Sequence, residues 1–278
     1  MFVTKLKILP SGISLKSLIN SDIQMLSEKL IYNILLIVIY GISIIVFAAL
    51  FFIPAPYGKF TRKGWGVRIN PKIAWIVMEF PAVFVMLLCF FTGDRKANIV
   101  AIVFLLIWML HYIQRTFIYP FLMKSKKNNF PILIILFSVL FNILNGYLNG
   151  RYLFYFSSAY DRVWLREPRF ITGAVIFFAG YVINIYSDHL LRNLRRHGEN
   201  GYSIPHGGLF KFISSPNYFG EIMEWIGWAL LTWSLAGAAF AVFTAANLVP
   251  RAVSNHKWYL KNFPDYPKKR KALIPFVY

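Results

Sequence analysis

The sequence predicts an all-α integral membrane protein with seven transmembrane helices, the N-terminus outside and the C-terminus cytoplasmic. Three observations lead to this expectation. Hydrophobic residues make up 58% and aromatic residues 18% of the 278 residues. Apolar stretches of membrane-spanning length recur along the chain, and basic residues collect in the loops between them. Water cannot be the preferred solvent for most of the surface of such a protein.

A bilayer core of about 30 Å is crossed by about 20 mostly apolar residues in a helix. Loops with Pro, Gly, Asn and basic residues separate the stretches that reach this length. The last two stretches are so close together that the Ser-Leu-Ala-Gly segment at 234–237 has to form the turn between them. We expect membrane spans over 31–53, 73–92, 98–118, 131–148, 170–187, 219–236 and 237–256.

The positive charge of the chain predicts its orientation. The chain has 30 Lys and Arg against 11 Asp and Glu, a formal net charge of +19. Most basic residues fall on one side of the expected spans, which the positive-inside rule places in the cytoplasm together with the C-terminus. They alternate with apolar runs, which favours membrane lipid and not nucleic acid as their partner. The basic loops are those around 59–72, 124–127, 192–211 and 257–271.

The chain contains no internal repeat, low-complexity tract or Pro-rich linker that would divide it. We therefore expect an N-terminal extension over 1–30 followed by a single seven-helix domain over 31–278. The extension has no compact apolar stretch ending in a cleavage site, so no cleaved signal peptide is predicted. Cys89 is the only cysteine, which excludes an intramolecular disulfide. No obligate protein partner is evident. A multi-pass protein of this kind would lie in a bacterial inner membrane or in the endoplasmic reticulum, depending on its source.

Ionisable residues inside apolar segments are the first candidates for function, because a charge at the bilayer centre costs at least about 2.5 kcal/mol. Glu79 is the clearest case, in the run Ala-Trp-Ile-Val-Met-Glu-Phe-Pro, with Pro81 two positions later. A protonated carboxyl in that setting could donate a hydrogen bond to a ligand oxygen. The alternative is a glutamate that only packs against a neighbouring helix.

A polar cluster closes the third apolar run. His111 and Arg115 are four positions apart, and Tyr112 and Arg115 are three apart, so each pair can share a helix face. Tyr112 would then offer a phenolic donor near a carbonyl group. A tyrosine at the membrane interface would show the same spacing.

The fifth expected span carries a polar stripe. Asn184, Asp188 and Arg195 fall within about 40° of one another on a helix, with Arg192 about another 40° round. An arginine at the cytoplasmic end, with amide and carboxylate groups deeper, suits a dinucleotide, because the guanidinium can fork onto phosphate. The alternative is an Asp188–Arg192 ion pair beside basic residues that contact lipid head groups.

The next helix begins with a similar pattern. Pro216 suits the first turn of a helix, and Asn217, Glu221 and Glu224 come within about 60° of one another where an apolar run starts. Two carboxylates and an amide at a membrane boundary are expensive unless they bind something. In the tail, the four consecutive cations at 268–271 suit the 2′-phosphate of NADPH, although lipid is the commoner partner of such a cluster.

The common soluble motifs are absent. The chain has no Gly-x-Gly-x-x-Gly after a strand, no phosphate loop, no His-Glu-x-x-His and no Gly-x-Ser-x-Gly. A nucleotide site would therefore have to be built from helices and their loops, and no metal ligand set is predicted.

From about residue 70 to its end, the chain resembles the steroid 5α-reductase family, and within that family we expect the type 2 enzymes to be the nearest. Met78 stands where the family commonly has Gln. The resemblance is carried by Glu79 in Met-Glu-Phe-Pro, by His111-Tyr112 with Arg115-Thr-Phe, by Asn184-Ile-Tyr-Ser-Asp188, by Gly201-Tyr202-Ser-Ile-Pro-His-Gly-Gly, by Asn217-Tyr-Phe-Gly-Glu221 and by Asp265-Tyr-Pro-Lys-Lys-Arg270.

The resemblance implies a seven-helix membrane bundle that holds NADPH in its cytoplasmic half and opens beside it for a lipid-soluble substrate. Glu79 and Tyr112 would hold the substrate ketone. The residues that would line the cofactor are Asn184, Asp188, Arg195, Tyr202, Asn217, Glu221, Arg251, Tyr259 and Arg270.

The reaction that the resemblance implies is the NADPH-dependent reduction of the 4,5 double bond of a 3-keto-4-ene steroid, such as testosterone or progesterone, with hydride going to C5. A membrane reductase of another lipid enone, an enoyl-CoA or a polyprenol, is the nearest alternative. Methyl transfer to an isoprenylated cysteine and a non-enzymatic lipid carrier are further alternatives. The first would need S-adenosylmethionine, and the second would show no cofactor dependence.

Overall fold

A computed structural model of the chain describes residues 15–124, 130–158, 160–194 and 202–277. It is an all-α bundle in which the third helix continues through a π-helical turn, Gln114–Ile118, into the short α4, Tyr119–Leu122. The fifth helix, α5, ends in a second π-helical turn, Tyr152–Phe156. The long helices are α1 (Leu15–Phe52), α2 (Pro71–Thr92), α3 (Ile99–Ile113), α5 (Ile132–Arg151), α6 (Pro168–Asn193), α7 (Pro216–Thr232) and α8 (Leu235–Asn262).

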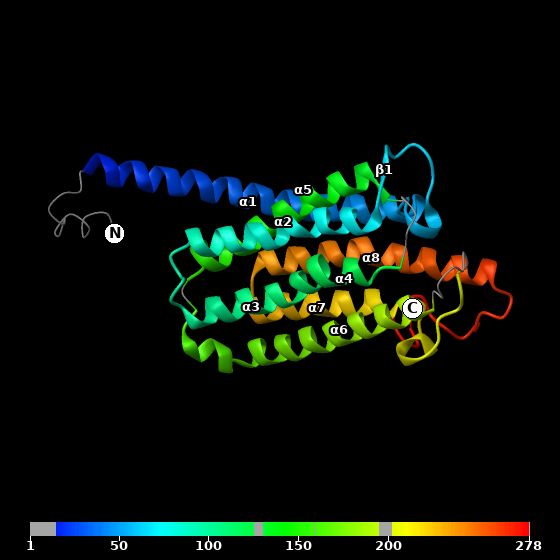
Figure 1. Cartoon of the computed structure of the whole chain (residues 1–278). Helices are drawn as coiled ribbons and strands as arrows, with labels where there is room; N and C mark the ends of the chain where they lie inside the picture. Colours follow the sequence, from blue (N-terminus) through cyan, green and yellow to red (C-terminus); the bar gives the residue numbers. More distant parts are fainter. Residues whose placement is uncertain (1–14, 125–129, 159, 195–201, 278) are drawn as a thin grey trace.

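The long helices lie side by side, and α1 extends beyond the others at one end of the bundle (Figure 1). Within the described residues, six helices are long and apolar enough to cross a membrane. The chain is therefore a multi-pass membrane protein, and six of the seven predicted spans are confirmed. The expected span over 219–236 corresponds to α7, which has only 17 residues and is not among the six.

Side-chain caps explain where several helices begin. Asn70 accepts a hydrogen bond from the backbone N–H of Lys72 (2.9 Å) ahead of α2, and Asn98 caps α3 in the same way. Ser234 caps α8 by accepting from the N–H of Gly237 (2.9 Å). The turn between α7 and α8 is thus shorter than the expected 234–237, because Trp233 in the left-handed conformation (φ 46°) ends α7 and Leu235 already starts α8.

A two-stranded antiparallel ribbon, which the sequence did not predict, joins two loops at one end of the bundle. β1 (Arg68–Ile69) pairs with β2 (Phe130–Pro131). The ribbon ties the loop before α2 to the start of α5, two helices that also pack against each other along their length.

The core lies between α2, α3, α7 and α8 and is aromatic. Trp108 and Trp228 are fully buried, and each indole N–H has a hydrogen-bond acceptor, the carbonyl of Ala82 (3.0 Å) and the amide oxygen of Asn149 (2.9 Å). A buried indole needs such a partner because the polar N–H is otherwise costly to bury. The core therefore holds α3 and α7, which both carry polar candidates, in a fixed relative position.

Helices α6 and α7 approach each other most closely. A Cβ added at Gly180 would lie 2.5 Å from the carbonyl oxygen of Gly220, and one added at Gly227 would lie 2.6 Å from that of Gly173. Small residues at both positions let the two backbones meet, as is common in membrane helix pairs. The polar residues of α6 and α7 are brought together by this contact.

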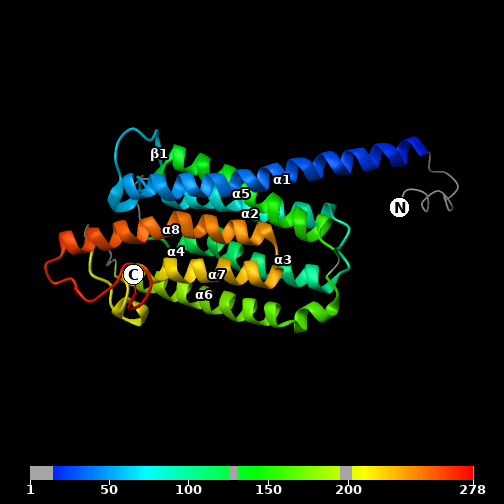
Figure 2. The ribbon, with the colours of Figure 1, turned by 180° about the vertical axis from the view of Figure 1, so that it is seen from behind.

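The two ends of the bundle differ. The start of α1 lies at the end opposite the segment that follows α8, as both views show (Figures 1 and 2). At the α1 end, Glu28 binds Arg151 of α5 through two contacts of 2.6 and 2.8 Å. The described parts of the loops after α1, α4, α6 and α8, which are rich in basic residues, lie at the other end.

Candidate functional site

A cavity of about 1360 Å³ opens between the helices and is lined by α1, α2, α3, α5, α6, α7 and α8. Ligand pockets commonly measure about 300–1,000 Å³. This cavity is therefore large enough for two ligands, such as a nucleotide and a second, apolar molecule.

The character of the cavity changes along α8. Phe240 and Phe243 line it near the start of the helix, and Arg251 lines it further along. At about 1.5 Å per residue, Arg251 lies roughly 16 Å along the axis from Phe240. Leu50 of α1 and Phe137 of α5 also line the cavity. The cavity thus has one apolar part and one polar, cationic part.

Glu79 and Tyr112 both line this cavity, from α2 and α3. Tyr112 is 2% exposed and packs against Trp108 and Trp225 (ring centroids 4.8 and 5.8 Å away), which does not fit an interfacial tyrosine. Asn142 of α5 donates to the backbone oxygen of Met78 (2.6 Å) and to Oε2 of Glu79 (3.4 Å). The carboxyl of Glu79 is therefore oriented by a neighbouring helix while it faces the cavity.

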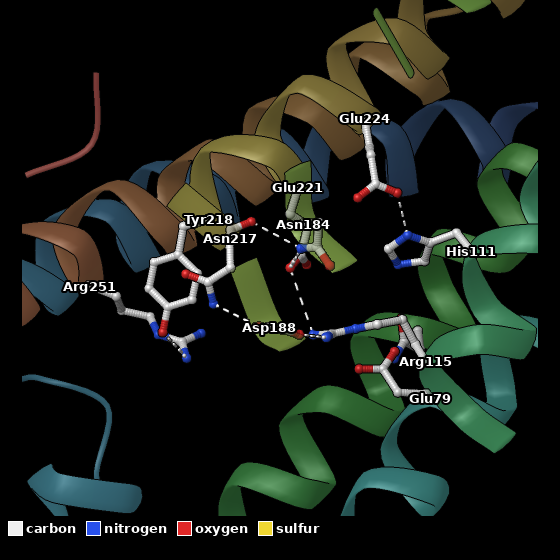
Figure 3. Close-up of polar contacts among 11 residues, drawn as sticks. Glu79, His111, Arg115, Asn184, Asp188, Asn217, Tyr218, Glu221, Glu224 and Arg251 are labelled. Atoms are coloured by element: carbon white, nitrogen blue, oxygen red, sulfur yellow. Dashed lines mark hydrogen bonds and ion pairs between the residues drawn. The ribbon is translucent and has the colours of Figure 1, made fainter. Parts of the chain in front are cut away.

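Arg115 is the centre of the polar network (Figure 3). Its Nη1 lies 3.2 Å from Oδ2 of Asp188, and its Nη2 lies 3.7 Å from Oε2 of Glu221. The guanidinium also stacks on Trp75 and Tyr119, 4.9 and 4.8 Å from the ring centroids. Two carboxylates and one buried cation stabilise one another here, as buried charges require.

Amide side chains complete the network between α6 and α7. Asn217 donates to Oδ1 of Asp188 (3.1 Å), and Asn184 donates to the backbone oxygen of Asn217 (3.0 Å) and to Glu221 (3.3 Å). Asn184, Asp188 and Arg192 of the predicted stripe lie on α6, but Asp188 is paired with Arg115 of another helix. Arg192 lines the cavity instead, and its buried Nη1 has no hydrogen-bond partner among the described residues.

A second cavity of about 220 Å³ adjoins the polar part and shares Tyr57, Asn217 and Arg251 with it. Lys59 and Arg251 are its cations, and no carboxylate is among the described residues that line it. Burial lowers the pKa of Lys59 to about 7. Such a site favours a multiply charged anion such as a phosphate, because the anion would supply the negative charge that balances the two cations.

Seven of the eleven residues predicted for the site line the main cavity, and Tyr259 lines the second one. Asn184 lies behind the wall and holds Asn217 and Glu221. Arg270 lines neither cavity. It is buried beside the ring of Tyr266, and its Nε and Nη1 have no hydrogen-bond partner among the described residues. Arg195 lies outside the described residues. The seven are Glu79, Tyr112, Asp188, Tyr202, Asn217, Glu221 and Arg251.

Four further polar residues of the site are not among the eleven: Asn142, which the sequence did not single out, and His111, Arg115 and Glu224, which stood out without a specific role. Nδ1 of His111 lies 2.6 Å from Oε2 of Glu224, and both side chains are buried. Each of these residues is polar within an apolar segment, which is a signal that the sequence does contain. Their partners are 63 to 113 positions away along the chain, and no local pattern reveals such pairings.

Known proteins resemble this chain over nearly its whole length. A family model described as 3-oxo-5-alpha-steroid 4-dehydrogenase matches residues 128–278. A protein of Solanum lycopersicum named steroid 5-alpha-reductase DET2 is 45% identical over 256 residues, which are 91% of this chain and 99% of that protein. The Bos taurus protein 3-oxo-5-alpha-steroid 4-dehydrogenase 1 is 41% identical, with the same coverage. These relatives are DET2 and type 1 proteins, and the expectation that the type 2 enzymes are the nearest is not borne out.

Proposed function

Because the chain belongs to the 3-oxo-5α-steroid 4-dehydrogenase family, the steroid 5α-reductases, we propose that it reduces the 4,5 double bond of 3-keto-4-ene steroids with NADPH. The observation that supports this most directly is the large cavity that Glu79 and Tyr112 line together with both apolar and polar side chains.

The apolar part is the proposed steroid site. Its walls are aliphatic and aromatic side chains of α1, α5 and α8, which suit a rigid, uncharged ring system. A 3-keto steroid has one polar atom at the end that would face Glu79 and Tyr112. The site therefore matches a molecule that is apolar over most of its length and carries a carbonyl at one end.

Glu79 and Tyr112 are the proposed donors to the C3 ketone. As the double bond is reduced, negative charge develops on the ketone oxygen, and two hydrogen bonds from a carboxyl and a phenol stabilise that charge. Their effect is large because the surroundings are apolar and exclude water. Asn142 holds the Glu79 carboxyl in place for this role.

The polar part and the second cavity fit NADPH. When bound, this cofactor would supply the hydride that C5 of the steroid receives. Lys59, Arg192 and Arg251 would hold its phosphates, since each faces a cavity and none of them forms an ion pair with another described residue. Asn217, Glu221 and Asp188 would fix its ribose and carboxamide groups, with Arg115 keeping the two carboxylates in place.

The first test is turnover of testosterone and progesterone by the purified protein in detergent or lipid, with NADPH as the reductant. We expect 5α-reduced product from the wild type. Tyr112→Phe removes one donor to the developing oxyanion and should lower kcat by about 10²–10³-fold. Glu79→Gln should also lower kcat, because an amide N–H is a weaker hydrogen-bond donor than a carboxyl O–H.

Glu167→Gln is the matched control, because Glu167 is a carboxylate on the surface at the start of α6, far along that helix from Asp188. It should turn over like the wild type. Consumption of NADPH only with an enoyl thioester or a polyprenol would reject the steroid substrate. Turnover that survives both site substitutions would reject the roles of Glu79 and Tyr112.

A further inference from the structure

The two buried side chains His111 and Glu224 form a pair that the hydride-transfer chemistry above does not use. Nδ1 of His111 lies 2.6 Å from Oε2 of Glu224, and the side chains are 4% and 0% exposed. The imidazole ring also packs against Trp225, 4.6 Å between centroids. A contact this short in apolar surroundings indicates a strong hydrogen bond that fixes the ring.

Glu224 is sealed from the cavity, whereas His111 lines it. The second carboxyl oxygen of Glu224, Oε1, is buried and has no hydrogen-bond partner among the described residues. An ionised carboxylate with one bare oxygen would be costly there, so the favoured form of the pair has Glu224 neutral and donating its proton to Nδ1. The hydrogen of the imidazole then sits on Nε2.

That Nε2 is free to act on a bound molecule. Figure 3 shows the second ring nitrogen of His111 turned away from Glu224. His111 precedes Tyr112 in the sequence, and both line the same cavity. When Tyr112 holds the C3 ketone of a steroid, C4 is the atom bonded to C3. In the proposed complex C4 then lies next to the cavity wall to which His111 belongs.

We propose that Glu224 and His111 form a proton relay that delivers the proton to C4 and so completes the reduction. This inference rests on the proposed function. Reduction at C5 leaves an enolate, and the electron pair of its C3–C4 double bond forms the new C4–H bond with the hydrogen of His111 Nε2. As that N–H bond breaks, Nδ1 takes the proton of Glu224, and the C3 carbonyl is restored. Glu224 ends as a carboxylate and, after product release, regains a proton from water through the imidazole of His111, which lines the cavity.

The other carboxyl groups of the cavity and the groups that contact them or share their proposed role are poorer proton sources. Asp188 and Glu221 are paired with Arg115 and accept amide hydrogen bonds, which stabilises their ionised, acceptor-only form. Arg115 does not lose its proton in proteins. Glu79 and Tyr112 are occupied at the ketone oxygen in the proposed site.

The test is reduction of a 3-keto-4-ene steroid in D₂O, followed by NMR of the product to find which face of C4 carries deuterium. A relay fixed on one side of the ring should place the label on one face only. Glu224→Gln is the decisive variant, because its amide fills the same space and can still donate to Nδ1 but has no proton to transfer. We expect its turnover to fall by about 10²-fold or more, the usual contribution of a general acid, and its label to appear on both faces.

Glu167→Gln again serves as the matched control and should keep both the rate and the labelled face. Unlabelled product incubated with the enzyme in D₂O corrects for exchange at C4. A Glu224→Gln variant that keeps one labelled face, whether fast or slow, overturns the relay, since a merely structural residue would change the rate and not the face. A wild type that forms no saturated steroid rejects the proposed function itself.

A second variant keeps the test independent of folding effects at Glu224. His111→Ala removes the relay ring and leaves a space into which free imidazole can enter. We expect added imidazole to raise the turnover of His111→Ala at least tenfold and to leave the turnover of the wild type unchanged. His111→Ala that binds NADPH, as followed by cofactor fluorescence, but gains nothing from imidazole would count against the relay.

Discussion

Lys59 lies over the rings of Trp258 and Tyr259, 4.4 Å from each centroid, and lines the second cavity. Burial lowers its pKa to about 7, from an ordinary value of 10.5, so the free protein loses this charge as the pH rises through 7. A bound phosphate favours the charged ammonium and holds its proton to higher pH. Binding of NADPH should therefore take up a proton above pH 7.

The predicted consequence is that the affinity for NADPH falls between pH 7 and 9, by up to about tenfold per pH unit. Lys59→Met should bind more weakly at pH 7 and show a flatter pH dependence. Lys63→Met, at an exposed position four residues later, should behave like the wild type. Titration calorimetry at several pH values measures all three, and an unchanged slope in Lys59→Met would place the phosphates elsewhere.

Asn142 is the residue that orients Glu79. Asn142→Ala removes the hydrogen bond to the carboxyl and the one to the backbone of Met78. We expect kcat to fall about tenfold, the equivalent of roughly 1.4 kcal/mol, because Glu79 would spend less time pointing at the ketone. KM for the steroid should change less.

Steady-state kinetics separates the two parameters, with Asn262→Ala as an amide control at the far end of α8. If Asn142→Ala keeps a normal kcat while Glu79→Gln is inactive, then Glu79 is needed but is oriented without Asn142.

At the level of elements, the close contact between α6 and α7 positions the polar network. A Cβ at Gly220 would lie 2.6 Å from the backbone N of Asn184 and from the backbone oxygen of Gly180, and backbone atoms cannot move aside as a side-chain end can. Gly220→Ala should therefore push the helices apart and lower the stability by about 1–3 kcal/mol. NADPH binding should weaken too, because Asn184 and Glu221 flank the contact.

Gly41→Ala in α1 is the matched control, since a Cβ there meets nothing within 4 Å. Alanine is the better helix former by about 1 kcal/mol, so this variant should be as stable as the wild type or more so. Thermal unfolding in detergent compares the two. Equal melting temperatures for both variants would show that α6 and α7 can separate at little cost.

The helices were predictable to the extent that length and apolar composition decide them. Six expected spans are present, and capping residues such as Asn70 and Asn98 mark two helix starts. The extension of α1 back to Leu15 was not predicted, because its first part mixes polar and apolar residues. Nor was the π-helical turn at Gln114–Ile118, which depends on tertiary packing and has no local pattern.

The site was predictable as a set of residue types and not as a set of contacts. Glu79 and Asp188 stood out because charges in apolar segments are costly. Their partners, Asn142 and Arg115, lie 63 and 73 positions away and come together only when the bundle packs. Arg270 shows the opposite case: the basic tail suggested a phosphate contact, but its side chain is buried outside both cavities.

For the whole molecule, the structure groups the basic loops, the cationic part of the cavity and the segment after α8 at one end of the bundle. The start of α1 and the loop before α6 lie at the other end (Figures 1 and 2). The positive-inside rule assigns the basic end to the cytoplasm. NADPH would then reach its proposed site directly from the cytoplasm, whereas a steroid would arrive through the membrane.

This orientation can be measured with single cysteines in a Cys89→Ala background. Lys269→Cys lies at the basic end and Arg166→Cys at the opposite end, and both positions are exposed. In sealed vesicles with the cytoplasmic face inside, a membrane-impermeant maleimide should label Arg166→Cys at once and Lys269→Cys only after detergent is added. The reverse pattern would place the cationic part of the cavity on the non-cytoplasmic side, where a cytoplasmic pool of NADPH could not reach it.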